Sequence, residues 1–104
     1  HFDNWITIAQ IFEKHYQNEK DTVRKKQILS YIIDYKNLTL LMNWKAQKNE
    51  QLWKYSYDAY KKLASLAFAD YWSSEFSKEI KKKNFLQNLP TDLGYKIFRK
   101  RFGS

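Results

Sequence analysis

Glycine, proline and cysteine are scarce in this chain of 104 residues, which contains two Gly, one Pro and no Cys. The three Gly and Pro residues lie at or after Pro90, so the first 89 residues hold none of the strong turn formers that β-hairpins need. This shortage predicts helices over most of the chain. The lack of Cys excludes disulfides, zinc–thiolate sites and cysteine nucleophiles, and it fits an intracellular origin.

Long apolar runs and catalytic motifs are missing as well. The longest apolar patch, LTLLM at Leu38–Met42, is far shorter than the roughly 18–20 residues that cross a bilayer, so we expect no integral membrane segment. His1 and His15 do not make a metal cluster, and no glycine-rich loop exists to hold phosphates, so we expect no metal and no cofactor. Glu13 and His15 are two residues apart on a predicted helix and therefore point apart. We expect a binding domain and not an enzyme.

The length and composition fit one folded domain over residues 1–104. Hydrophobic residues make up 43% of the chain and aromatic residues 18%, which is enough apolar area to form a core. The sequence begins at His1 and not at Met, and it shows no basic and then apolar leader. We therefore expect a domain excised from a larger protein.

Apolar residues recur at helical spacing in the first half of the chain. The first predicted helix follows Asp3 or Asn4, and the second begins at Asp21 or Thr22. The end of the second helix stays open, because the same phase continues from Asn37 through Met42. The predicted apolar faces consist of Trp5, Ile8, Ala9, Phe12 and Tyr16 in the first helix, and of Val23, Ile28, Tyr31, Ile32 and Tyr35 in the second.

The third segment, from about Asn49, has the most regular apolar arc. Its predicted members are Leu52, Trp53, Tyr57, Tyr60, Leu63, Ala64, Ala67, Phe68 and Tyr71. Trp72 and Phe76 fall outside this arc, so either the helix breaks near Ser73 or these two aromatics form a contact surface. Length favours the break, because one rod would be too long for a compact domain of this size.

The last helix is predicted to begin at Thr91 or Asp92, just after Pro90, and to stop at Gly103. The Pro, Thr, Asp and Gly residues of this stretch are interpreted as helix punctuation. The fold expected from all these segments is an all-α, compact bundle of four or five helices with a basic amphipathic C-terminal helix.

Positive charge is concentrated near the C-terminus. The chain has a net charge of +8, but residues 1–80 hold 12 basic and 10 acidic side chains, whereas residues 81–104 hold 7 basic and 1 acidic. The basic residues of this last part are Lys81, Lys82, Lys83, Lys96, Arg99, Lys100 and Arg101. We expect them to bind a polyanion, with nucleic acid as the first hypothesis. An acidic protein surface would be an alternative partner for the same residues. The alternative without a partner is that Lys and Arg near the end of the last helix only complement the helix dipole.

An exposed aromatic patch is the alternative binding surface. Tyr55, Trp72 and Phe76 fall off the predicted core arc and are the candidates for contact with another protein, in an interaction or assembly domain of a larger protein. The oligomeric state and the identity of the partner do not follow from these residues.

The stretch ITIAQIFEKHYQNEKDTVRKKQILSYI, residues 6–32, resembles a bacterial helix-turn-helix, with Ala9 at the packing position of the first helix. The resemblance implies that the second helix enters the major groove of DNA. The residues that would face the groove are Thr22, Arg24, Lys25 and Lys26. The connection between the two helices is several residues longer than in this family, and it lacks the turn Gly.

Overall fold

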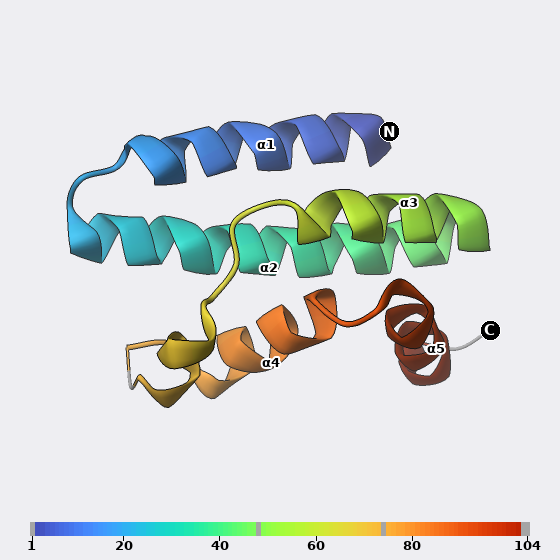
Figure 1. The fold of residues 1–104 in the computed structure, drawn as a ribbon. Coiled ribbons are helices and arrows are strands. Elements are labelled where there is room, and N and C mark those ends of the chain that lie inside the picture. Colours follow the sequence, from blue (N-terminus) through green and yellow to red (C-terminus); the bar gives the residue numbers. More distant parts are fainter. Residues whose placement is uncertain (1, 48, 74, 103–104) are drawn as a thin grey trace.

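The chain folds into helices only, within the residues that the computed structural model describes, which are 2–47, 49–73 and 75–102. The elements in chain order are α1 (Phe2–Asn18), α2 (Thr22–Gln47), α3 (Glu50–Lys61), the short 3-10 helix η1 (Phe68–Trp72), α4 (Lys78–Gln87) and α5 (Thr91–Phe102). The predicted all-α bundle is confirmed (Figure 1). None of the described helices combines the length and the apolar character needed to cross a membrane.

Helix α2 is the central element of the bundle. Its 26 residues extend roughly 39 Å at 1.5 Å per residue, close to the 41 Å long dimension of the molecule. Helices α1 and α3 run antiparallel to α2, and α4 packs on another side of it (Figure 1). The buried residues of α2 recur every three or four positions and are Leu29, Ile32, Ile33, Lys36, Thr39, Leu40, Asn43 and Trp44. This spacing gives α2 a buried stripe along most of its length.

The start of α2 was predictable from a capping residue. The Asp21 carboxylate accepts a hydrogen bond from the Val23 amide at 3.2 Å, which satisfies one of the free N–H groups at the helix start. The helix does not stop near Asn37 but continues through Met42, and it ends at Gln47, five residues beyond the longer predicted phase. The prediction that Val23 and Tyr31 are buried is wrong, since both side chains are exposed.

The resemblance to a helix-turn-helix does not hold in the structure. Helices α1 and α2 form an antiparallel hairpin (Figure 1), whereas the two helices of a helix-turn-helix cross at about 90–120°. Of the basic residues at the start of α2, Arg24 pairs with Asp21 of the same turn and Lys26 pairs with Glu75. The start of α2 is therefore not arranged as a recognition helix.

The core consists of two clusters of buried apolar side chains. The first lies among α1, α2, α3 and α5 and includes Trp53, whose ring stacks on that of Tyr57 with centroids 4.9 Å apart. The second lies among α2, the segment after α3, and α4. Its buried members are Leu29, Ile33, Leu66, Phe76 and Ile80. The predicted packing of Tyr57 and Tyr60 in the core is confirmed.

Helix α3 ends at Lys61, about twelve residues before the break predicted near Ser73. At this end, the buried ammonium of Lys36 from α2 donates to the carbonyl oxygens of Tyr60 and Ala64 at 3.4 and 3.0 Å. The Tyr60 carbonyl also accepts from the Leu63 amide at 3.1 Å, so the helix closes with a tighter last turn that Lys36 bonds to. The predicted core positions Ala67 and Phe68 are consequently exposed, because the chain no longer follows the phase of α3.

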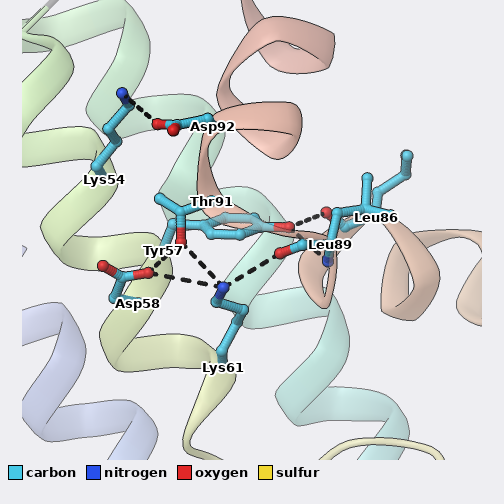
Figure 2. Close-up of polar contacts among 8 residues, drawn as sticks. All are labelled: Lys54, Tyr57, Asp58, Lys61, Leu86, Leu89, Thr91 and Asp92. Carbon is cyan, nitrogen blue, oxygen red and sulfur yellow. Dashed lines mark hydrogen bonds and ion pairs between the residues drawn. The ribbon is translucent and has the colours of Figure 1, made fainter.

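Helix α5 begins at Thr91, as predicted, and is attached to α3 by a set of polar contacts (Figure 2). Lys54 pairs with Asp92 at 2.7 Å, and Lys61 donates to the Thr91 hydroxyl at 2.9 Å. The Tyr57 hydroxyl donates to the Leu86 carbonyl at 2.7 Å. These contacts fix both the end of α4 and the start of α5 on α3. The predicted helix stop at Gly103 lies outside the described residues.

Candidate functional site

An open apolar groove runs between η1 and α4, with a volume of about 720 Å³. Three aromatic side chains beside it are turned toward solvent: Phe68 is 77% exposed, Trp72 79% and Phe85 56%. The other lining residues are Ser65, Leu66, Tyr71, Asn84 and Asn88. We call this feature the aromatic groove. Such a concentration of exposed rings is uncommon in a small domain, and exposed apolar patches often occur at interaction sites.

The polar side chains in the floor of the aromatic groove are bonded within the protein. The Asn84 carboxamide oxygen accepts from the Leu66 amide at 3.0 Å, and its nitrogen donates to the Tyr71 hydroxyl at 2.7 Å. The side-chain nitrogen of Asn88 donates to the backbone carbonyl of Asn84 at 2.7 Å. Both side-chain groups of Asn84 and the side-chain nitrogen of Asn88 are therefore engaged, and the groove offers mainly apolar surface.

The α4 wall of the groove follows from the phase of that helix. Ser77 caps its start, with the hydroxyl accepting from the Ile80 amide at 3.1 Å. Ile80, Asn84 and Gln87 are the buried residues and lie on one face. Phe85 directly follows Asn84 and so lies off the buried face, at the edge of the groove.

The η1 wall is a single short stretch of 3-10 helix. The Asp70 amide donates to the Ala67 carbonyl at 2.9 Å, and the Ser73 amide donates to the Asp70 carbonyl at 3.1 Å. None of the five residues Phe68–Trp72 is buried. The rings of Phe68 and Trp72 pack edge to face with centroids 6.1 Å apart, so each limits the freedom of the other.

The predicted aromatic patch of Tyr55, Trp72 and Phe76 is corrected by the structure. Trp72 is exposed, as predicted, but Phe76 is only 6% exposed and belongs to the second core cluster. The reason is the early end of α3, after which Phe76 packs with Ile80 just before the cap of α4. Tyr55 is exposed but lines a separate depression between α1 and α3. The structure therefore brings Trp72 together with Phe68 and Phe85 instead.

Sequence reasoning overlooked Phe85 and misplaced Phe68 in the core. The signal for Phe68 was the group FADYW at residues 68–72, where the apolar residues no longer fit a single helical face. The signal for Phe85 would have been its position beside the buried Asn84 in α4, and no pattern of apolar residues reveals a buried Asn.

Two of the predicted basic residues are engaged inside the molecule. Lys83 pairs with Asp34 at 2.7 Å and with Glu79 at 3.4 Å, and the hydrogen bond to Asp34 raises the pKa of Lys83. Lys81 donates to the Ser73 carbonyl and so connects α4 to the segment after η1. These two residues have structural contacts that compete with binding to a polyanion.

The other predicted basic residues lie at the surface of α4 and α5. Lys82 and Arg101 line a cleft of about 160 Å³ between these helices, together with the paired Lys83. Lys96, Arg99 and Lys100 are exposed on α5 and form no ion pair with the residues that the structure describes. The positive charge of the last quarter of the chain is therefore spread over two helices, with part of it neutralised.

Among the described residues, Lys36 is the basic group whose pKa departs most from its ordinary value, and its contacts are structural. Burial lowers the pKa of Lys36 to about 8. Its ammonium is occupied by two carbonyl oxygens, and it lines none of the pockets described above. No group of three or more metal-ligating side chains occurs among the described residues.

Comparisons of the chain with protein-family models, with curated proteins and with solved structures find no match. Function is therefore argued from the aromatic groove and from the charge around it.

Proposed function

We propose that this domain is a non-catalytic binding module that docks a protein partner in the aromatic groove. The observation that carries the proposal is the exposure of Phe68, Trp72 and Phe85 around one groove of about 720 Å³. Each large ring covers about 150–250 Å² when fully buried, so three rings offer a large part of one side of a standard interface. Trp and other aromatic residues also dominate the binding energy of protein interfaces.

The test of this proposal is a selection of binding peptides followed by mutation. Peptides are selected from a displayed random library on the wild-type domain, and their dissociation constants are then measured for a Phe68→Ser, Trp72→Ser, Phe85→Ser triple variant. The three side chains are exposed, so the variant should remain folded, which circular dichroism checks. We expect a loss of affinity of about 100-fold or more.

The matched control is Tyr55→Ser, which removes an exposed aromatic ring outside the groove. It should leave the affinity of the selected peptides unchanged. Selected peptides that bind the triple variant as well as the wild type would show that the groove is not the binding site. Chemical-shift changes in the amide spectrum that map away from η1 and α4 would contradict the proposal in the same way.

A second candidate function is binding of a polyanion, with nucleic acid as the first hypothesis, through α4 and α5. It is favoured by the exposure of Lys96, Arg99 and Lys100 on one helix and by Lys82 and Arg101 beside a common cleft. Contacts of this kind are made to phosphates and are independent of sequence. Nucleic-acid affinity should then fall steeply as the salt concentration rises.

Charge reversal separates this second candidate from general attraction to a basic protein. The triple variant Lys96→Glu, Arg99→Glu, Lys100→Glu should abolish nucleic-acid binding and flatten the salt dependence. The control variant Lys14→Glu, Lys20→Glu, Lys45→Glu changes the net charge equally at exposed positions of residues 14–45. Equal losses of nucleic-acid affinity in the two variants would show that the affinity depends on net charge and not on these three residues of α5.

A further inference from the structure

We infer that the segment bound in the aromatic groove is an amphipathic helix that carries acidic side chains beside its apolar face. This inference rests on the proposed protein-binding role of the groove and names the chemistry of the partner. Its three grounds are the mainly apolar surface of the groove in a fold whose described residues form no strand, the positive charge next to it, and the net charge of the whole chain.

The groove offers little to the backbone of an extended peptide. An added strand needs a sheet edge with free N–H and C=O groups, and the described residues contain no strand. The Asn84 amide is engaged by Leu66 and Tyr71, as described above. A helix satisfies its own backbone and presents apolar side chains at i, i+3, i+4 and i+7, which suits an apolar groove of this size.

Positive charge lies on α4 beside Phe85, outside the lining of the groove, with Lys82 also facing the cleft between α4 and α5. Lys82 precedes Phe85 by three residues and Lys78 precedes it by seven, so the three residues lie along one side of α4. Both lysines are exposed, and neither has an ion-pair partner within residues 2–47, 49–73 and 75–102. Asp70 of η1 is the acidic group on the opposite wall.

The neighbouring carboxylates do not cancel these two lysines. Glu79 is paired with Lys83, and Glu75 is paired with Lys26. Helix α4 therefore has unneutralised positive charge beside the groove that matches a row of Glu or Asp on the partner. Such complementarity accelerates association and excludes basic partners.

The charge of the whole chain argues against a second copy as the occupant. Each copy has a net charge of +8 and would bring the same basic α4 toward the other. An acidic segment is attracted by this field instead. Nucleic acid would also be attracted, but the mainly apolar surface of the groove suits the apolar face of a helix better than the polar edges of bases.

The experiment uses three designed peptides of about five helical turns. The first has Leu at i, i+3, i+4 and i+7 with Glu at the flanking positions, the second replaces each Glu with Lys, and the third is a scramble of the first. Fluorescence anisotropy measures their dissociation constants for the 104-residue chain. We expect the acidic amphipathic peptide to bind at least about tenfold more tightly than either control.

A charge swap on the protein makes the test specific. The Lys78→Glu, Lys82→Glu variant should reverse the preference, so that the Lys peptide binds more tightly than the Glu peptide. The control Lys14→Glu, Lys20→Glu changes the same amount of charge on α1 and the turn after it, and should leave the preference for acid in place. An unchanged preference in the Lys78, Lys82 variant would overturn the inference.

The failure of this inference and the failure of the proposed function give different results. If library-selected peptides require Phe68, Trp72 and Phe85 but are basic or extended, the groove binds proteins and the inference is wrong. If no peptide depends on these rings, the proposed function itself fails. If an oligothymidylate binds with an affinity that depends on Trp72, the groove is a nucleic-acid site, and both are overturned.

Discussion

A Cβ on Gly94 of α5 would lie 2.7 Å from both Cζ and Oη of Tyr57 in α3. The Tyr57 ring has little freedom to move away, because its hydroxyl donates to the Leu86 carbonyl at 2.7 Å and accepts from the Leu89 amide at 2.9 Å (Figure 2). Gly94 is therefore required by close packing of α5 on α3. The sequence suggested that this glycine marks a helix boundary. Gly94 instead lies within α5, where the Tyr57 ring leaves no room for a side chain.

Substitution of Gly94 by Ala should destabilise the domain by about 1–3 kcal/mol, because the added methyl group overlaps the Tyr57 ring. At an unhindered helix position the same change would stabilise by roughly 0.5–1 kcal/mol. The two expectations have opposite signs, so urea denaturation decides between them. An unchanged or increased free energy of unfolding would show that the Tyr57 ring moves to accommodate the added methyl group.

Removal of the Tyr57 hydroxyl in Tyr57→Phe should cost about 1–3 kcal/mol, since the Leu86 carbonyl and the Leu89 amide both lose their partner. Hydrogen exchange at the Leu89 amide should become faster than in the wild type. The control is Tyr31→Phe, at an exposed position of α2, which should change the free energy of unfolding by less than about 0.5 kcal/mol. Equal effects of the two variants would contradict the proposed attachment of α4 to α3.

Two neighbouring aromatics should respond oppositely to truncation. Phe76→Ala removes a ring from the second core cluster and should destabilise the domain by about 3–5 kcal/mol. Trp72→Ala removes an exposed ring and should change the free energy of unfolding by less than about 0.5 kcal/mol. Guanidinium denaturation of both variants measures the difference. A large loss for Trp72→Ala would mean that this ring supports the fold and is not kept for binding.

The buried Lys36 should make stability depend on pH in the alkaline range. Its pKa is lowered from 10.5 to about 8 in the folded state, so between these values the unfolded chain binds more protons. Stability therefore rises with pH from about 8 to about 10, and the contribution of Lys36 is at most about 3 kcal/mol. Above pH 10 the trend should reverse, because burial raises the pKa of Tyr57 and Tyr60 to about 12 and the unfolded chain ionises first.

The Lys36→Met variant isolates this effect. The difference in free energy of unfolding between wild type and variant should change by about 1–3 kcal/mol from pH 7 to pH 10, since only the wild type carries the buried ammonium. Tyr57 and Tyr60 are present in both proteins and cancel in this difference. A difference that stays constant over this range would show that the Lys36 ammonium is hydrated in the folded state.

The parts of the fold that depend on local chemistry were predictable. Asp21 and Thr91 mark helix starts because a capping side chain and a preceding Pro act within one turn of the chain. The end of α3 was not predictable, because the contacts around it come from Lys36, which lies about 25 residues earlier, and from Asn84, about 20 residues later. Neither residue type signals a buried role in a sequence.

The same limit explains the outcome for the candidate site. Trp72 and Phe76 both fall outside the predicted apolar arc, but α3 ends at Lys61, so the phase of that helix describes neither position. The exposure of Trp72 agrees with the prediction, whereas Phe76 is buried in the second core cluster. The grouping of Phe68 and Phe85 with Trp72 depends on how η1 and α4 pack, which follows from contacts distant in sequence.

The η1 segment has the properties of an exchangeable recognition loop. None of its five residues is buried. It is held by Leu66, which Asn84 fixes, by Phe76 in the second core cluster, and by Tyr71, which packs on that cluster and accepts from Asn84. The other residues of the range 67–73 can therefore be diversified while these three anchors are kept. The helices would then serve as a constant framework, and new specificities could be selected by changing one wall of the groove, as is done with the variable loops of antibodies.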